Sequence, residues 1–298
     1  SDMFIPVGAF QYTLTAPALN SYTFLSSGSN LTISANNTNG SAVYNLLANG
    51  NSINTQTTSS YSYTHNNITS NQVYQLNITQ GTTTFTANFT VVINPGTVTQ
   101  TLPTGLEDGI NYNPSDATKA TLVLNAPFKD FVYVAGSFNN WQPTSTYAMK
   151  KDSSTGKFWL ELTGLTPGQV YTYQYWVCDQ TNRPANSPAL VKTADPFSTL
   201  VLSPFDDPEI QTLGVYPNLP IYPTGQEREV TVLQTGQTPY TWSAATLNFV
   251  KPKKKDLVIY EVLIRDFDAN RTYQDLLKNP MDEANFETLT KSELVKIN

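Results

Sequence analysis

Short runs of alternating apolar and polar residues fill the first third of the chain. Within residues 1–97 they recur at roughly ten-residue intervals, separated by asparagine, glycine and serine. Alternation with a period of two is typical of strands that bury one face. The pattern predicts six or seven strands of an immunoglobulin-like β-sandwich. The runs are FQYTLTA, LTISA, AVYNLLA, VYQLNIT and FTANFTVVI.

The composition of this first segment leaves a second interpretation open. Asp2 is the one charged residue within residues 1–97, which contain neither lysine nor arginine. A segment so polar and so poor in charge is also compatible with a disordered, low-complexity stalk. The regular alternation and the closing strand FTVVI favour the sandwich. Neutral sandwiches rich in threonine and asparagine are typical of spacers or glycan binders on secreted proteins.

A second β-sandwich is predicted over residues 117–205. Its strands are again short and bounded by turn residues, and the run Asp152–Gly156 has the composition of a hairpin turn. The predicted strands are Ala120–Asn125, Phe131–Ala135, Phe158–Leu162, Val170–Val177 and Leu190–Thr193.

The run YTYQYWV, residues 171–177, predicts a strand with two different faces. Its three tyrosines share one face, which we expect to pack in the core of the sandwich. Gln174 and Trp176 share the opposite face.

The segment FVYVAGSFNNW, residues 131–141, combines an alternating strand with a corner. Gly136 and the pair Asn139–Asn140 tolerate the positive φ angles of a sharp turn, which brings Trp141 to its mouth. Together with KFWLEL and YTYQYWV, this segment resembles the early-set β-sandwich of carbohydrate-binding module family 48. That module precedes the catalytic barrel in many enzymes of glycoside hydrolase family 13, the α-amylase family.

Three further segments carry the same resemblance. GLEDGINY resembles the lead-in to the early-set domain in Bacteroidetes-type α-amylase-family enzymes, and KTADPFSTLVLSPFDD resembles the passage from such a module to the barrel. VIYEVLIRDF resembles the first barrel strand, and its apolar run Leu257–Ile264 is typical of a strand buried on both faces. The resemblance implies an α-glucan, such as starch or glycogen, as the binding partner.

The resemblance places the glucan contact on Trp141, Gln174 and Trp176. Flat aromatic rings stack on the apolar faces of glucose, and a neighbouring amide binds the hydroxyl groups. The alternative is that Trp176 covers the core or packs against another domain, while Trp141 only pins the corner. Gln174 stands where the known glycogen binders have a lysine, and CDQTNRPANSPAL has no counterpart of their second tryptophan. Any binding is therefore expected to be weak.

The amylase-like barrel is incomplete in this sequence. A barrel needs about 250 residues, and the resemblance fails after Lys278. None of the family's motifs for the aspartate nucleophile, the glutamate acid and the third aspartate is present. Glu261, Asp266 and Asp268 are carboxylates close in sequence, but Glu261 lies within the predicted strand. We expect no catalytic residue here and no activity on α-glucans.

Composition excludes several other classes of function. The net charge is −6, and no basic stripe is interleaved with aromatic residues, which argues against a nucleic-acid partner. No apolar run approaches the roughly 20 residues of a membrane span. Cys178 and His65 are single, so neither a metal site nor a cofactor is expected. Cys178 is expected to be a small core residue at a strand end, and His65 to be solvated in a polar loop.

The sequence therefore predicts a mainly β chain with two consecutive sandwiches and the start of a (β/α)₈ barrel. It starts with Ser-Asp-Met, and we expect a removed leader and a secreted or surface-anchored protein. One interpretation is that the chain is the non-catalytic N-terminal region of an α-glucan-degrading hydrolase. The catalytic barrel of that hydrolase would then be its partner. The other is a stand-alone surface protein that binds glycan or protein. The expected segments are the first sandwich (1–97), a linker (98–116), the second sandwich (117–205), a proline-rich connector (206–255) and a truncated barrel start (256–298).

Overall fold

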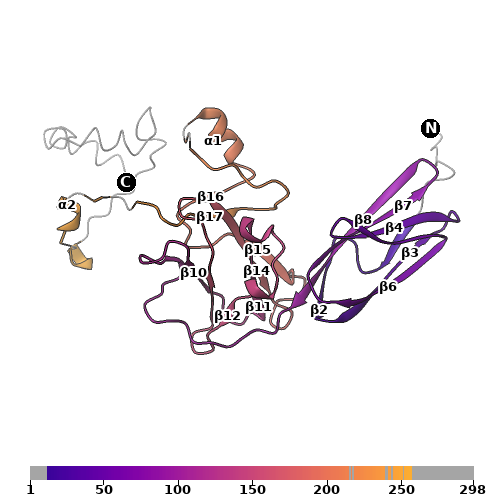
Figure 1. Cartoon of the computed structure of the whole chain (residues 1–298), viewed down its shortest axis with the longest axis horizontal. Coiled ribbons are helices and arrows are strands. Elements are labelled where there is room, and N and C mark those ends of the chain that lie inside the picture. The colour runs from indigo at the N-terminus through magenta and orange to yellow at the C-terminus, as the bar shows by residue number, and fades with distance from the viewer. Residues whose placement is uncertain are drawn as a thin grey trace. The chain divides into compact units, whose positions relative to one another are not determined.

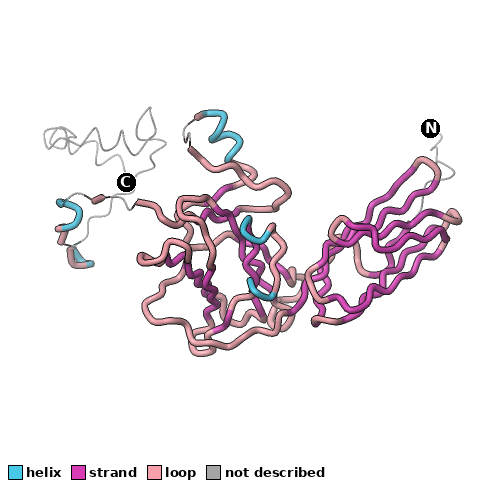
Figure 2. The backbone as a smooth tube through the Cα atoms, in the orientation of Figure 1, coloured by secondary structure: helices cyan, strands magenta, loops and turns pink. Residues whose placement is uncertain are grey.

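The chain is mainly β and divides into two compact units, Ser1–Thr238 and Pro239–Asn298. The first unit contains two β-sandwiches that follow one another along the sequence (Figures 1 and 2). In the second unit, the described elements are α2 (Ala244–Leu247) and the 3₁₀ turn η3 (Lys254–Asp256). The computed structural model describes residues 12–214, 216, 218–238, 241–242, 244–250 and 252–256.

The first sandwich has eight strands within the described residues. Strands β1, β3 and β6 form one sheet, and the other sheet has the order β2-β8-β7-β4-β5, with β2 and β8 parallel. This distribution of strands over two sheets is the one found in immunoglobulin-like sandwiches. The strands are β1 (Tyr12–Ala16), β2 (Tyr22–Ser26), β3 (Ser29–Asn37), β4 (Ala42–Ala48), β5 (Asn51–Thr58), β6 (Ser60–Ile68), β7 (Gln72–Gln80) and β8 (Thr83–Asn94).

Alternation along the strands builds the core of this sandwich. In β4 every second residue is buried, and the ring of Tyr44 stacks on that of Tyr61 at a centroid distance of 5.0 Å. Tyr74 stacks on Phe89 at the same distance. The predicted sandwich is confirmed, and residues 12–94 are not a disordered stalk. Three strands are not among the predicted runs (β2, β5 and β6), and the last two are rich in serine, threonine and asparagine.

His65 differs from expectation. It lies in strand β6, is partly buried, and its Nδ1 atom is 2.6 Å from the hydroxyl of Tyr74. The prediction of a solvated loop residue is wrong because Tyr74 reaches it from the facing sheet.

The second sandwich has two sheets. One has the order β12-β13-β10-β9, and the other has the order β11-β14-β17-β16, with β15 paired to the same edge of β14 as β17. The strands are β9 (Gly109–Tyr112), β10 (Ala120–Asn125), β11 (Phe131–Gly136), β12 (Lys150–Lys151), β13 (Lys157–Leu162), β14 (Tyr171–Cys178), β15 (Leu190–Thr193), β16 (Val201–Leu202) and β17 (Val230–Leu233).

The tyrosine face of β14 packs into the core of this sandwich, as predicted. Tyr173 and Tyr175 are fully buried, and both hydroxyls donate to one carboxylate oxygen of the buried Asp195, each at 2.8 Å. The buried carboxylate therefore satisfies two polar groups that the core would otherwise leave without partners. Cys178 is buried at the end of β14, as expected, and burial raises the pKa of its thiol.

The predicted linker and connector both contribute to the second sandwich. Residues 98–116 include β9, an edge strand paired with β10, and the Leu102 amide donates to Asp152 at 2.8 Å. Residues 206–255 include α1 (Asp207–Leu213) and β17, which pairs with β14. The second sandwich therefore extends beyond the predicted bounds 117–205, because short segments on either side pair with its longer strands.

Three further expectations concern the predicted barrel strand, a membrane-spanning helix and a metal site. The predicted barrel strand Leu257–Ile264 and the carboxylates near it lie outside the described residues. In the described part of the chain, no helix is long and apolar enough to cross a membrane. The described residues also contain no group of three or more His, Cys, Asp or Glu side chains that could hold a metal ion.

Candidate functional site

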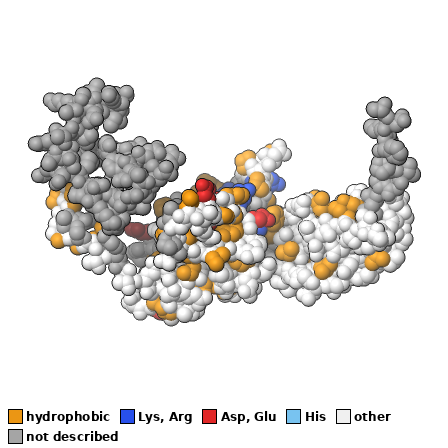
Figure 3. Space-filling view, turned by 90° about the horizontal axis from the view of Figure 1, so that it is seen from above, with side chains coloured by type: hydrophobic (Ala, Val, Ile, Leu, Met, Phe, Trp, Pro, Cys, Tyr) orange, Lys and Arg blue, Asp and Glu red, His pale blue; other side chains and the backbone are white. Residues whose placement is uncertain are grey.

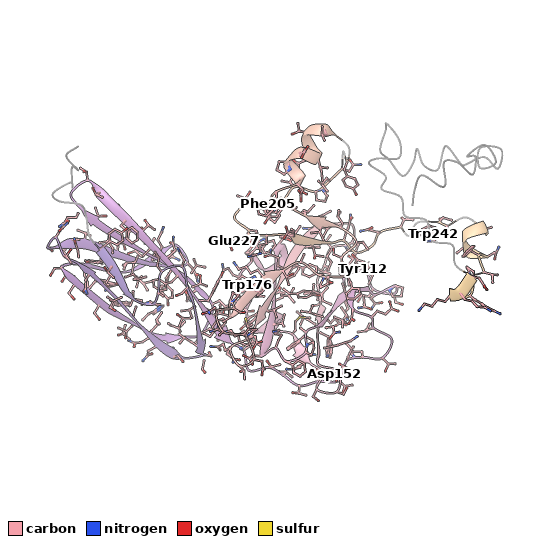
Figure 4. All side chains as sticks on the ribbon, turned by 180° about the vertical axis from the view of Figure 1, so that it is seen from behind. Tyr112, Asp152, Trp176, Phe205, Glu227 and Trp242 are labelled. Carbon is pink, nitrogen blue, oxygen red and sulfur yellow. The ribbon has the colours of Figure 1, made fainter. Side chains whose placement is uncertain are left out.

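Trp176 lies on the face of β14 that points away from the sandwich core. It is nevertheless only 6% exposed, because it belongs to a second apolar cluster. We call this the junction cluster, since residues of both sandwiches meet in it (Figure 4). Its buried members are Val92, Phe131, Tyr133, Ala135, Trp176, Cys178 and Leu190, and Tyr22, Phe24, Trp141 and Ala148 pack against them.

A lysine closes over the ring of Trp176. Lys192 Nζ is 5.1 Å from the centroid of the Trp176 ring and 5.9 Å from that of Tyr22. A cation over an aromatic face is attracted by the ring quadrupole. The ring of Trp176 is therefore occupied by protein neighbours and is not open for stacking on a sugar.

Gln174 is fully buried on the same face of β14. Its side-chain amide donates to the carbonyl oxygens of Glu227 at 2.6 Å and Glu229 at 2.9 Å. These carbonyls belong to the segment leading into β17, so Gln174 fastens that segment to the sheet. Glu227 of this segment is labelled in Figure 4. The expectation that Gln174 and Trp176 form a face open to solvent is therefore wrong. Alternation places the two side chains on one face correctly, but that face is covered by the first sandwich and by residues 227–229.

Trp141 is partly exposed and stands at the predicted corner. Asn140 and Trp141 both have positive φ, 52° and 58°. The Asn139 side chain accepts from the Gly136 amide and donates to the Val134 carbonyl, both at 2.9 Å. Trp141 donates its own amide to the Gly136 carbonyl at 2.9 Å. The corner is thus held by a closed set of hydrogen bonds.

Gly136 serves the corner in a different way from the one expected. Its φ is −163°, an extended value open to any residue. A Cβ atom at this position would lie 2.6 Å from the carbonyl oxygen of Thr172 and 2.8 Å from the ring of Phe138. Glycine is required here because the backbone of the corner approaches β14 too closely for a side chain.

The structure brings Trp141 and Trp176 into one cluster, but as packing residues. Trp141 also packs against a small cluster formed by Leu202, Val230 and Val232. It lies between the two clusters and keeps part of its surface accessible. Of the three residues expected to contact sugar, only Trp141 remains available to a ligand.

Hydrogen bonds reinforce the junction between the sandwiches. The Asn71 side chain accepts from the Ile93 amide at 2.8 Å and donates to the Pro143 carbonyl at 2.9 Å. The Tyr133 hydroxyl donates to the Ile93 carbonyl at 2.8 Å. The alternative that Trp176 packs against another domain agrees with this interface, whereas its partners in the first sandwich were not identified from the sequence. The signal was present in Phe131–Gly136, where every residue is apolar, because a strand with two apolar faces is buried on both.

A pocket of about 590 Å³ opens beside the corner. Gln142, Pro143 and Thr144 follow Trp141 directly and line it together with Asn49 and Asn71. The volume lies within the range of roughly 300–1,000 Å³ typical of small-molecule sites. Its lining offers amide and hydroxyl groups without a charged side chain, a composition suited to a neutral polar ligand.

Comparisons with known proteins give no family. No family model and no curated protein matches the chain. The solved structures that resemble it have low sequence identity to this chain. A chimeric titin Z1Z2-Z1Z2 tandem is 13% identical, with 61% of this chain and 96% of that chain covered and a TM-score of 0.28.

Two further similar structures come from bacterial proteins. The fibronectin(III)-like modules of Clostridium thermocellum CbhA are 13% identical, with 61% and 92% covered and a TM-score of 0.26. A Klebsiella pneumoniae pullulanase complexed with maltotriose is 15% identical, with 44% of this chain but 12% of that chain covered and a TM-score of 0.26. TM-scores this low carry no argument about the function of this chain.

Proposed function

We propose that this chain is the non-catalytic N-terminal region of an extracellular α-glucan-degrading glycoside hydrolase, in which the two sandwiches act as one spacer with a weak glucan contact. The observation that carries the proposal is the junction cluster. Its aromatic residues come from both sandwiches, and the rings of Phe24 and Phe131 meet edge to face at 6.2 Å.

A shared apolar core restricts motion between the sandwiches. Domains of one chain move relative to each other by default unless their interface is large and hydrophobic. Here the interface buries aromatic rings. The backbone amide of Ile93 donates to the Asn71 side chain, and its carbonyl accepts from the Tyr133 hydroxyl. Such a connection holds a downstream domain at a set distance and orientation, which is what a spacer requires.

The surface of the first sandwich suits an extracellular spacer. Residues 12–97 carry no charged side chain, and the face seen in Figure 3 shows neither blue nor red atoms over this sandwich. Beside a few exposed apolar residues, its solvent-facing side chains include hydroxyls and amides, and the exposed hydroxyls of Thr79 and Thr84 lie 2.9 Å apart. A neutral polar surface resists nonspecific binding to charged polymers.

The glucan contact is assigned to Trp141 and the pocket beside it. One partly exposed ring and a few amides contribute little beyond the ordering cost of binding. We therefore expect a dissociation constant in the high micromolar to millimolar range, which corresponds to a binding free energy of about 4–6 kcal/mol. The amylase-family resemblance of residues 131–141 supports an α-glucan as the ligand.

Exposed apolar side chains support a partner at the C-terminal part of the first unit. Phe197, Phe205, Leu213 and Ile221 are all more than half exposed. Large apolar groups that remain exposed often mark a surface covered by another protein. We assign the catalytic barrel of the parent hydrolase as this partner.

Two measurements test the proposal. Amide ¹⁵N relaxation should give one rotational correlation time for both sandwiches, and two clearly different times would contradict the spacer. Titration with maltoheptaose and β-cyclodextrin should show weak binding at this contact, seen as shifts of the Gln142 and Thr144 amides that Trp141→Ala abolishes. Trp242→Ala, which removes an exposed tryptophan from the second unit, is the control and should bind like the parent.

A further inference from the structure

A pocket of about 660 Å³ lies at a place in the second sandwich that the glucan contact does not use. Four parts of the chain meet there: residues 94–97 at the end of β8, residues 128–130 between β10 and β11, Lys151 of β12, and residues 180–182 beyond β14. The volume is again within the roughly 300–1,000 Å³ of ligand pockets.

Phe128, between β10 and β11, is an unusual residue for its position. Its φ is 68°, a left-handed value, and its side chain is 77% exposed. It follows Pro127 in a turn, and where a residue after such a proline needs positive φ, glycine or asparagine is usual. The Phe128 carbonyl accepts from the Asn182 side chain at 2.8 Å, which holds the turn in this form.

Neither packing nor backbone preference explains this phenylalanine. A buried ring would stabilise the fold, whereas this ring faces solvent, and the backbone would accept a smaller residue more readily. Residues kept in unfavourable backbone conformations are concentrated at binding sites. The ring therefore points to a ligand that uses a flat aromatic surface.

The charged groups of this pocket already have hydrogen-bond partners. Lys129 Nζ lies 2.8 Å from the Asp179 carboxylate, and Lys151 Nζ donates to the Lys129 carbonyl at 2.8 Å. The Asp130 carboxylate accepts from the amides of Gln180 and Thr181, at 2.6 and 3.2 Å. With Asp179 included, two lysines are matched by two aspartates, so the pocket has no net charge that would favour an ionic ligand.

Uncharged polar groups remain at the rim. The side chains of Gln180 and Thr181 line the pocket and make no hydrogen bond to other described residues. An amide and a hydroxyl donate to and accept from a polyhydroxylated ligand. A flat aromatic ring next to them suits the apolar face of a pyranose.

We propose that this pocket binds a neutral saccharide, with a pyranose ring stacked on Phe128 and its hydroxyl groups bonded to Gln180 and Thr181. The site is separate from the glucan contact at Trp141 and does not rest on it. The ligand is a neutral pyranoside of any linkage, whereas the glucan proposal requires an α-glucan.

The test is NMR titration of the full chain with maltoheptaose, cellohexaose and mannohexaose at millimolar concentration. At least one probe should shift the amides of residues 128 and 180–182. Phe128→Asn should weaken that binding at least about tenfold and leave the melting temperature equal or higher, because asparagine tolerates positive φ. Gln180→Ala should weaken binding to a smaller extent.

Three controls make the outcome decisive. Phe128→Tyr keeps the ring and should bind like the parent. Phe205→Ala removes an equally exposed ring elsewhere, 76% exposed, and should change nothing. Trp141→Ala separates the two sites, since it should leave the shifts at residues 180–182 intact. Absence of shifts there with all three probes, or parent-like binding by Phe128→Asn, overturns the proposal.

Discussion

The hydroxyl of Tyr133 in β11 donates a hydrogen bond to the carbonyl oxygen of Ile93 in β8, 2.8 Å away, and so links the two sandwiches. Both residues are buried, at 2% and 5% exposure. Burial, with a smaller contribution from Cys178, raises the pKa of the Tyr133 hydroxyl to about 12. The group therefore stays a neutral donor throughout the physiological range.

Tyr133→Phe should lower the free energy of unfolding by about 1–2 kcal/mol, since it leaves a buried carbonyl without its partner. Urea denaturation measures this. Tyr147→Phe is the matched control, because the Tyr147 ring stacks on Phe138 and its hydroxyl has no partner among the described residues. Equal stability of both variants would show that the junction bond contributes nothing.

Trp176→Ala should destabilise the chain by about 3–5 kcal/mol, the usual cost of removing a large buried aromatic side chain. Trp141→Ala should cost clearly less, because Trp141 is only partly buried. Chemical denaturation of both variants gives the comparison. If Trp176→Ala keeps the parent stability and loses glucan binding, Trp176 belongs to a binding surface and the packing interpretation fails.

Gly136→Ala should destabilise the corner by about 1–3 kcal/mol through overpacking against the Thr172 carbonyl and the Phe138 ring. Gly164 is a useful comparison, because its φ is 73° and a Cβ placed there would meet no atom of the described residues within 4 Å. Asparagine tolerates positive φ, so Gly164→Asn should be milder than Gly164→Ala. Gly136→Asn should be no milder than Gly136→Ala, and a rescue there would refute the steric explanation.

Asp152 makes stability depend on acid pH. Its carboxylate accepts from the Ser154 hydroxyl at 2.6 Å and from the Leu102 amide at 2.8 Å, and these bonds, the Ser154 hydroxyl first, lower its pKa to about 2. A depressed folded-state pKa stabilises the fold above the unfolded pKa of about 4 and loses that contribution as the pH falls towards 2.

Asp152→Asn should therefore flatten the decline in stability between about pH 4 and pH 2. Urea midpoints of parent and variant at pH 5, 3.5 and 2.5 measure the difference. Parallel curves for the two proteins would show that Asp152 does not contribute to the acid transition.

Local pattern was sufficient to determine many of the strands and the faces of β14. The bounds Ala120–Asn125 and Leu190–Thr193 agree with β10 and β15, and the tyrosines of YTYQYWV lie in the core as predicted. Alternation indicates which residues share a face because successive side chains of a strand point to opposite faces. Strands β5 and β6 escaped prediction because their polar residues carry little of that signal.

Only the tertiary structure decided which residues pack against the Gln174 and Trp176 face of β14. Alternation shows that Gln174 and Trp176 share a face, but it does not show what lies against it. The covering groups are Tyr22 and Phe24, about 150 residues earlier in the chain, and the carbonyls of Glu227 and Glu229, 53 and 55 residues after Gln174. Burial of this face depends on contacts distant in sequence, and so the indole that suits a sugar platform serves instead to join two domains, while the amide fastens residues 227–229 to the sheet.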